Sequence, residues 1–243
     1  MKVSIIIPCF NEENYIETVI NSINETVNFE KEIIVIDDCS TDRSNKILKN
    51  LLEKNQIQQL INHKKNLGKG AAIRKGLDNV TGQIIIIQDA DLEYAPKDYI
   101  KLISPIKIGK ADVVYGSRFI GGGEDAHRVL YFHHRIANGI LTFISNIFTG
   151  INITDMETGY KAFTYDSVKD IKLEEDRFGF EPEITAKLAR KKLRFYEVGI
   201  SYHGRTYAEG KKIGLKDAFR ALYCIIKYSI IKIFIILSKK TLP

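Results

Sequence analysis

The sequence predicts an α/β fold, with helices on both faces of a mostly parallel, twisted sheet. In the first half of the chain, short β-branched runs alternate with segments of helical periodicity, which is typical of consecutive strand–helix–strand units. Several of these runs, such as residues 3–8 and 84–87, contain almost no polar side chain. Uninterrupted apolar strands are typical of parallel sheets that are covered on both faces.

The elements of the first half follow from local patterns. Residues 12–27 are predicted to form a helix because their apolar side chains recur on one stripe. The helix over residues 41–54 is expected to begin at a cap formed by Ser40 or Thr41. Strands are predicted at residues 3–8, 32–36, 58–61, 83–88 and 111–116, and helices at residues 12–27, 41–54, 68–79 and 96–106.

The second half is less regular. Three consecutive glycines at 121–123 predict a flexible joint. Because the chain shows neither an internal repeat nor a compositional linker, we expect one domain over residues 1–214 and an amphipathic extension over residues 215–243. Helices are predicted at residues 127–149, 183–192 and 216–237, and strands at residues 161–164 and 195–201.

Composition excludes several classes of protein. With 44% hydrophobic residues the chain is neither disordered nor of low complexity. The three cysteines are scattered and form neither a disulfide framework nor a paired zinc-ligand spacing, so we expect a reducing compartment. The apolar run at residues 3–8 is too short for an export signal, so we expect no signal peptide.

The net charge of +6 is concentrated at the C-terminal end. Residues 203–243 carry nine Lys and Arg against two acids, so the rest of the chain is close to neutral. Proteins that bind nucleic acids usually spread basic residues over the body, and we expect no nucleic-acid partner. Here the basic residues alternate with Ile, Phe and Tyr, which favours contact with a membrane surface.

Polar residues follow four of the predicted strands, at the point where each strand ends. Because parallel sheets bind ligands at the carboxyl ends of their strands, these residues are candidates for a site. A single acidic pair after a strand is often only a helix cap, whereas capping does not explain four such segments. They are residues 8–12 (Pro-Cys-Phe-Asn-Glu), 37–42 (Asp-Asp-Cys-Ser-Thr-Asp), 89–91 (Asp-Ala-Asp) and 116–118 (Gly-Ser-Arg).

Asp89 and Asp91 form the sharpest of these signals. Two carboxylates at positions i and i+2, on a turn that leaves a strand, can converge on one hard cation. Mg²⁺ and Mn²⁺ are commonly held by one or two carboxylates together with phosphate oxygens, so either ion fits this pair of ligands. The alternative is a pair of solvated loop aspartates.

Residues 66–70 (Asn-Leu-Gly-Lys-Gly) resemble a phosphate-binding loop only in part. The segment lacks the Ser or Thr that follows lysine in a Walker A motif, and it also departs from the dinucleotide fingerprint. A glycine-rich helix start at Gly68 and Lys69 can still bind an anion through its backbone N–H groups. A simple helix-start turn is the alternative.

Together residues 6–12, 37–42, 66–70 and 89–91 resemble the family 2 glycosyltransferases. That resemblance implies a GT-A fold, a nucleotide-sugar donor and inversion at the anomeric carbon. Within the family, residues 116–118 and 155–161 (Asp-Met-Glu-Thr-Gly-Tyr-Lys) resemble the polyprenyl-phosphate hexosyltransferases, such as dolichol-phosphate mannose synthase. The resemblance covers roughly residues 3–212.

The resemblance also implies roles for individual residues. Asp89 and Asp91 would hold the metal on the diphosphate, and Arg118 would meet the acceptor phosphate. Asp38 would accept a hydrogen bond from the base, and Glu12 would contact the base or the ribose. The residues that would line the nucleoside pocket are Pro8, Asn11, Glu12 and Asp38.

Two segments depart from the family pattern. Dolichol-phosphate mannose synthases tend to have Gln where this chain has Glu93, which is either a third metal ligand or a plain surface residue. The late basic loop, residues 203–212, matches only loosely and adds His203, a candidate metal or phosphate ligand. Its glycines make it mobile, so Arg205, Lys211 and the adjacent Lys212 can close over a diphosphate and offset the charge of the leaving group.

Two segments are both apolar and basic. Residues 127–149 form either an interfacial helix that admits a lipid or a core helix. Residues 218–237 contain eleven Ile, Leu or Phe, but Lys227 and Lys232 lie near the middle of the segment. The gain of ~5 kcal/mol from the apolar residues is cancelled by ~6 kcal/mol for the two lysines, so lying in the interface is favoured over spanning.

We therefore expect a metal-dependent hexosyltransferase at the cytoplasmic face of a membrane. The expected donor is a nucleotide-diphosphate sugar, either GDP-mannose or UDP-glucose, and the expected acceptor is a polyprenyl phosphate. Asp91, Arg118 and Arg205 are the side chains expected to act in the reaction.

Two other functions fit the same residues. One is a family 2 enzyme that glycosylates a sugar hydroxyl, for which Glu181 or Glu183 would be the general base. The other is a non-catalytic membrane adaptor that retains only nucleotide binding. An intact set of Asp89, Asp91 and Arg118 argues against the adaptor.

Overall fold

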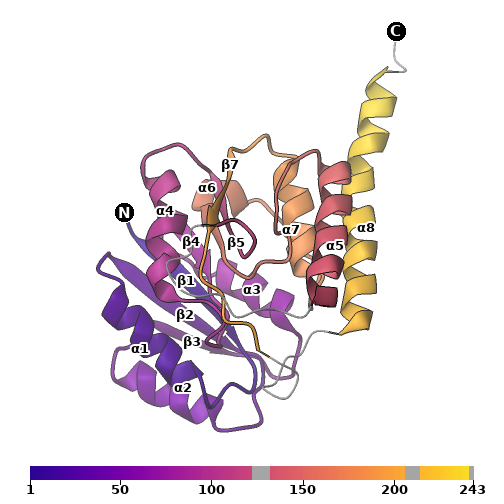
Figure 1. The fold of residues 1–243 in the computed structure, drawn as a ribbon. Helices are drawn as coiled ribbons and strands as arrows, with labels where there is room; N and C mark the ends of the chain where they lie inside the picture. The colour runs from indigo at the N-terminus through magenta and orange to yellow at the C-terminus, as the bar shows by residue number, and fades with distance from the viewer. Residues whose placement is uncertain (122–131, 206–213, 241–243) are drawn as a thin grey trace.

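A computed structural model describes residues 1–121, 132–205 and 214–240, with side chains omitted at positions 133, 215 and 230–240. In this part of the chain, strands form a seven-stranded sheet in the order β3-β2-β1-β4-β6-β5-β7 (Figure 1). The strands are β1 (Val3–Cys9), β2 (Lys31–Asp37), β3 (Gln59–Asn62), β4 (Ile84–Ile87), β5 (Val113–Ser117), β6 (Lys161–Thr164) and β7 (Phe195–Gly199).

Strand β6 is antiparallel to both of its neighbours, β4 and β5, and the other pairs are parallel. The prediction of a mostly parallel sheet is therefore confirmed. Because β5 runs in the same direction as β1, β2 and β4, the carboxyl ends of all four strands lie along one edge. The polar segments that follow these strands meet at that edge.

Helices cover both faces of the sheet, as predicted (Figure 1). Alternate residues of β2 show this, because Ile33 and Val35 pack with α1, α2 and α4, while Ile34 and Ile36 pack with α3 and α7. The helices are α1 (Ile16–Thr26), α2 (Ser44–Glu53), α3 (Lys69–Leu77), α4 (Tyr99–Lys107) after a 3₁₀ turn η1 (Pro96–Asp98), α5 (Phe132–Thr149), α6 (Tyr165–Val168), α7 (Phe180–Ala189) and α8 (Leu215–Lys240).

Two local expectations were wrong, and one short helix was not predicted. Neither Ser40 nor Thr41 caps α2, which begins at Ser44, where Asp42 accepts the Ser44 backbone N–H at 2.9 Å. Helix α7 begins at Phe180 rather than 183, because a proline at the third helical position lies within the first turn and is tolerated there. Helix α6 is too short to show a helical period, and its only local signal is the Thr164 cap. The predicted joint at 121–123 and the start of the helix expected over 127–149 lie largely outside the described residues.

Helices α5, α7 and α8 form one packed group at the side of the molecule (Figure 1). The first half of α8 contributes Ala221, Cys224, Ile225 and Tyr228 to its buried contacts. The expected division after residue 214 stays a prediction, but these contacts favour a division after Ser229. Beyond that point α8 continues past the end of α5 (Figure 1).

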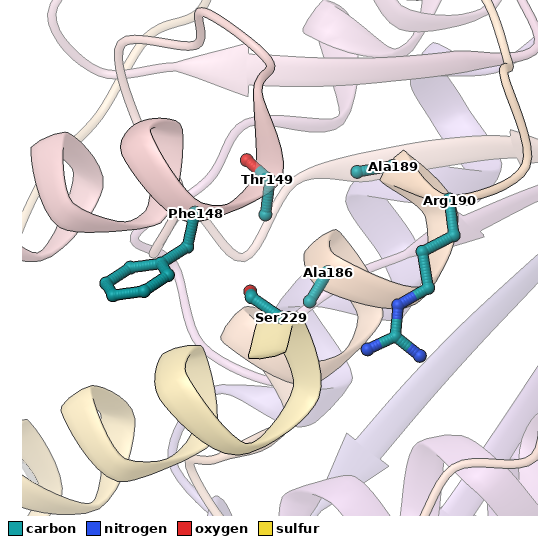
Figure 2. A pocket seen from close by; sticks show the side chains of 6 residues that line it. All are labelled: Phe148, Thr149, Ala186, Ala189, Arg190 and Ser229. Atoms are coloured by element: carbon teal, nitrogen blue, oxygen red, sulfur yellow. The ribbon is translucent and has the colours of Figure 1, made fainter. Parts of the chain in front are cut away.

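The three helices also enclose a small pocket (Figure 2). Ser229 of α8 faces Ala186 of α7 there, and neither the Ser229 hydroxyl nor the Nε and Nη2 atoms of Arg190 has a hydrogen-bond partner among the described residues. The pocket is lined by Phe148, Thr149, Ala186, Ala189, Arg190 and Ser229. Across residues 1–121, 132–205 and 214–240, none of the helices combines the length and apolar character needed to cross a bilayer.

Candidate active site

The loops after β1 and β2 are joined at the edge of the sheet by side-chain hydrogen bonds. Asn11 has a left-handed backbone (φ 53°), and its side-chain oxygen accepts the Thr41 N–H at 2.8 Å. The buried Glu12 follows, and its backbone N–H donates to Ser44 at 2.9 Å. The half-buried Pro8 lies at the end of β1. The residues expected to bind the nucleoside therefore lie together.

Asp38 positions the loop that begins α3. Its carboxylate accepts the backbone N–H groups of Leu67 at 2.9 Å and Gly68 at 2.7 Å. His63, which the sequence did not single out, contacts the same carboxylate through Nδ1 at 2.7 Å. Both oxygens thus have partners within the protein, and a contact between Asp38 and a nucleobase stays a prediction.

The two glycines that flank Lys69 allow a close approach of two chain segments. Gly68 has φ +106°, and a Cβ atom on it would lie 2.4 Å from the Asp176 carbonyl oxygen. A Cβ atom on Gly70 would lie 2.2 Å from the Glu175 carbonyl oxygen. The glycines therefore allow the start of α3 to pack closely against the backbone of residues 175–176.

Lys69, the first residue of α3, joins two carboxylates. Its Nζ atom lies 2.8 Å from Asp89 and 3.0 Å from Glu181. Burial alone would lower the pKa of Lys69, but the two carboxylates outweigh burial and raise it well above its usual range. Lys69 is therefore a fixed cation beside the aspartate pair.

Arg205 bridges three carboxylates from two loops. Its guanidinium contacts Asp91 through Nη2, Glu93 through Nε at 3.2 Å and Glu12 through Nη1 at 3.2 Å. Burial, with the nearby carboxylates of Asp89 and Glu93, raises the pKa of Asp91 to about 7 despite the arginine. The expectation that Arg205 belongs to the site agrees with its position.

The acidic cluster fits a hard divalent cation. In the described residues, Asp89, Asp91, Glu93 and Glu12 supply four carboxylates against the two cations Lys69 and Arg205. Carboxylate oxygens are the donors that Mg²⁺ and Mn²⁺ prefer. Within the ranges that the structure describes, no three His, Cys, Asp or Glu side chains are already arranged around one metal position.

Two members of the late basic loop have different positions. His203 is exposed, and its backbone N–H donates to the Glu93 carbonyl at 2.9 Å. This contact places the His203 backbone, rather than a ligating imidazole, at the cluster, and a role for the imidazole in metal binding stays a prediction. Lys211, expected to bind the diphosphate, lies outside the described residues.

Arg118, at the end of β5, is paired with the buried Asp155. The two side chains form a bidentate pair, with Nε to Oδ2 and Nη2 to Oδ1 both 2.7 Å. Asn138 of α5 accepts a further hydrogen bond at 3.3 Å, and the rings of Phe119 and Tyr202 flank the guanidinium. The arginine is therefore held rigidly. A phosphate could contact only the guanidinium N–H groups that these partners leave open.

The two glutamates considered as general bases have different surroundings. Both Glu183 oxygens accept backbone N–H groups, from Glu174 at 2.7 Å and Glu175 at 2.8 Å, and Lys187 forms an ion pair with the same carboxylate. Glu183 is thus a structural residue that fixes the segment before α7. Glu181 instead faces Lys69.

A buried cluster in the segment before β6 was not predicted. The Lys161 ammonium donates to the Met156 and Thr158 carbonyls and lies over the Tyr115 ring, 4.5 Å from its centroid. Burial lowers the pKa of Lys161 to about 8. Glu157 lies in the same segment. The motif over residues 155–161 marked this region, but sequence alone does not show which members face inward.

The model of the family described as glycosyl transferase family 2 matches residues 4–172, well over half of the chain. The chain belongs to glycosyl transferase family 2. This glycosyltransferase is 30% identical over 235 residues to an uncharacterized protein of Methanocaldococcus jannaschii, and the match covers 94% of this chain and 93% of that protein.

The glycosyltransferase is also similar to named enzymes. It is 28% identical to a dolichyl-phosphate β-glucosyltransferase of Trichomonas vaginalis, over 94% of this chain and 73% of the relative. It is 29% identical to a dolichol-phosphate mannosyltransferase of Pyrococcus furiosus, over 94% of this chain but only 64% of that longer protein. Its fold matches glucosyl-3-phosphoglycerate synthase of Mycobacterium tuberculosis, crystallised with Mn²⁺, UDP and phosphoglyceric acid, with a TM-score of 0.70, 17% identity and 94% and 78% coverage.

Proposed function

We propose that this glycosyltransferase transfers a hexose from a nucleotide-diphosphate sugar to a polyprenyl phosphate, with inversion at the anomeric carbon. The observation that carries the proposal is the buried Arg118–Asp155 pair, which places a rigid guanidinium at the same sheet edge as Asp89 and Asp91. A guanidinium suits a phosphate acceptor because it binds phosphate oxygens in pairs. The names of the dolichyl-phosphate and dolichol-phosphate relatives support the same acceptor class.

The donor end of the site is built from the aspartate pair and two cations. Asp89 and Asp91 would hold Mg²⁺ or Mn²⁺, with Glu93 as the third carboxylate in reach. Such an ion, when bound, offsets the charge of a leaving diphosphate. Arg205 and Lys69 already form ion pairs with these carboxylates. When a diphosphate binds, each cation can replace a carboxylate partner with a phosphate oxygen. GDP-mannose and UDP-glucose are the donors we propose to test.

The acceptor chemistry needs no general base. A phosphate monoester has a second pKa near ~6, so it is mostly a dianion at neutral pH. An acceptor oxygen forms the new bond to the anomeric carbon, while the bond to the diphosphate breaks and its electron pair leaves with the nucleoside diphosphate. No proton moves in this step. The site must therefore place the acceptor, and Arg118 is the side chain for that task.

Variants of Arg118 test this function. Because Arg118→Ala leaves Asp155 buried and unpaired, Arg118→Lys is tested beside it as the variant that keeps the charge but loses the fork. Both should abolish transfer to a short polyprenyl phosphate, while calorimetry shows unchanged affinity for the nucleoside diphosphate. Arg194→Ala, which breaks a bidentate pair with Asp112 away from the site, is the matched control.

A hydroxyl acceptor is the second candidate. It is favoured by one observation, that Oε2 of Glu181 is buried and accepts no hydrogen bond from a described residue. If Glu181 is a base, Glu181→Gln abolishes transfer while Arg118→Lys remains active, which is the opposite of the proposed pattern. Nucleotide binding without turnover of any donor would instead support the non-catalytic adaptor.

The surface formed by α5 and α8 supports attachment to a membrane. The two helices lie side by side (Figure 1). Each carries exposed apolar side chains at helical spacing. A polyprenyl acceptor lies in a bilayer, so this surface is proposed to rest on the cytoplasmic face of the membrane. The exposed side chains are Phe132, Ile136, Ile140, Phe143 and Ile147 of α5 and Phe219, Tyr223 and Ile226 of α8.

A further inference from the structure

Two glutamates near the site each have a buried side-chain oxygen without a hydrogen-bond partner among the described residues. Glu181, at the start of α7, is only 4% exposed. Its Oε1 atom meets Lys69, but its Oε2 atom accepts no hydrogen bond. Glu157 has the same deficiency at Oε1. A buried acceptor without a donor is costly, so each of these oxygens indicates a missing donor.

The segment that carries Glu157 runs between the donor end and the acceptor end of the site. Two residues before it, Asp155 holds Arg118. Two residues after it, Gly159 passes so close to Asp89 that a Cβ atom on it would lie 2.4 Å from Oδ2 of Asp89. Glu157 therefore lies between the acceptor arginine and the metal-binding aspartate.

Glu181 reaches the same region from the opposite side. Lys69 links it to Asp89, with distances of 3.0 Å and 2.8 Å. The charges of Glu157, Glu181 and Arg118 lie close enough to influence one another. The two glutamates thus both lie in the region beside the path from the diphosphate to the acceptor.

The transferred sugar must occupy that space. In an inverting displacement, the leaving oxygen, the anomeric carbon and the attacking oxygen lie nearly in line. With the diphosphate at Asp89 and Lys69 and the acceptor at Arg118, the hexose ring lies between them. Its hydroxyl groups are hydrogen-bond donors, and a carboxylate oxygen is an acceptor.

We propose that Glu157 and Glu181 bind the transferred sugar, each accepting a hydrogen bond from a hexose hydroxyl through the oxygen that now lacks a donor. This inference rests on the proposed function and names the class of sugar. The Glu181 carboxylate and the nearby aspartate pair repel a uronate, so the site selects a neutral hexose. Burial, together with Glu181, raises the pKa of Glu157 to about 8, in line with a site that disfavours more negative charge.

The test compares the affinity for a nucleotide sugar with the affinity for its nucleoside diphosphate. Calorimetry uses the full chain with UDP-glucose and UDP, and with GDP-mannose and GDP. The wild type should bind the nucleotide sugar more tightly. Glu157→Leu, which removes the acceptor oxygen, and Glu181→Gln, which removes the charge, should each weaken nucleotide-sugar binding about tenfold and leave nucleoside diphosphate binding unchanged.

Charge selectivity gives a second readout. Glu181→Gln should narrow the preference for UDP-glucose over UDP-glucuronate by about tenfold, because repulsion of the uronate by this carboxylate is removed. Glu174→Gln, which changes a half-exposed carboxylate in the segment before α7, is the matched control and should change neither affinity nor preference.

Three results would overturn the inference. They are a wild type that binds the sugar no more tightly than the diphosphate alone, variants that retain full sugar affinity, and variants that lose diphosphate and sugar affinity equally. An equal loss of both affinities would mean that Glu181 only positions Lys69 and does not contact the sugar. Failure of the wild type to glycosylate any polyprenyl phosphate, with the sugar-specific loss still present, would instead reject the proposed acceptor and leave the sugar site standing.

Discussion

At the scale of single residues, the site depends on charges that neutralise each other across loops. Asp89 faces Lys69, and Asp91 faces Arg205. The sequence predicted all four residues as members of a site, because each belongs to a recognisable motif. It did not predict the pairing of Arg118 with Asp155 or of Arg205 with Glu93, since 37 and 112 residues separate the partners.

The first prediction concerns Asp91. Asp91→Asn keeps the shape of the side chain but removes a negative charge from the site proposed to hold the metal on the diphosphate. We expect transfer to fall by about a hundredfold, the scale of losing one electrostatic stabiliser. Initial rates with Mn²⁺, Mg²⁺ or EDTA check this, and full turnover of the wild type in EDTA would contradict it.

The second prediction concerns Glu157 and the pH dependence of stability. Burial raises the pKa of its carboxyl from the ordinary value of 4.5 to about 8 in the folded protein, so between these values the folded state binds the proton that the unfolded state has lost. The free energy of unfolding therefore decreases as the pH rises through this window. Glu157→Gln should flatten the decrease by at most ~1.4 kcal/mol per pH unit.

Urea unfolding from pH 5 to pH 8.5, in EDTA, measures this slope. Asp91, whose pKa is also raised, contributes a decrease of the same sign and remains in the variant, so part of the slope persists. Glu53→Gln, on the exposed end of α2, is the control and should keep the wild-type slope. An unchanged slope in Glu157→Gln would show that Glu157 is ionised in the folded protein.

At the scale of elements, the strands were predicted within two residues and the helix ends less well. Continuous β-branched runs leave few alternatives for β1, β2 and β4. The position of β6 between β4 and β5 was not predictable, because strand order depends on contacts that are distant in sequence. The packing of α8 was not predictable either. An apolar stripe that packs against another helix has the same sequence pattern as one that contacts lipid.

The third prediction concerns two truncations of α8. A chain that ends after Gly214 loses Ile225 and Tyr228 and exposes the α7 surface that they cover. Each large buried side chain contributes roughly 1.5–3 kcal/mol, so this chain should be insoluble or unfolded. A chain that ends after Ser229 keeps these contacts and should remain folded.

Circular dichroism and thermal melting of the two truncations decide the matter. If both chains melt at the wild-type temperature, the first half of α8 is not part of the core. That result would support the division after residue 214 that was expected from the sequence.

At the scale of the whole molecule, many of the exposed apolar side chains lie on the neighbouring helices α5 and α8. Ile147 and Phe143 of α5 are 63% and 66% exposed, and α8 continues from the same group of helices (Figure 1). Arg118 donates a hydrogen bond to Asn138, which lies on the same helix α5. A membrane that rests on α5 would therefore bring a lipid phosphate near Arg118.

The fourth prediction tests that surface. Replacing Phe143 and Ile147 by Glu should reduce co-sedimentation with anionic liposomes by about tenfold or more, because two charges replace apolar contact area. Ile100→Glu is the matched control, since Ile100 is 63% exposed on the distant helix α4. High salt should weaken binding of the wild type. Equal losses in both variants would remove α5 as the contact surface.

The antiparallel strand β6 also bears on how the protein is made. It lies between β4 and β5, although it follows both along the chain. During synthesis on the ribosome, β1 to β4 can pair as they emerge, but β5 has no neighbour until residues 161–164 appear. Until then the edge of β4 is open to pairing with other chains. Nascent chains arrested before residue 161 should therefore depend on chaperones, and those that expose β6 should acquire protease resistance in one step.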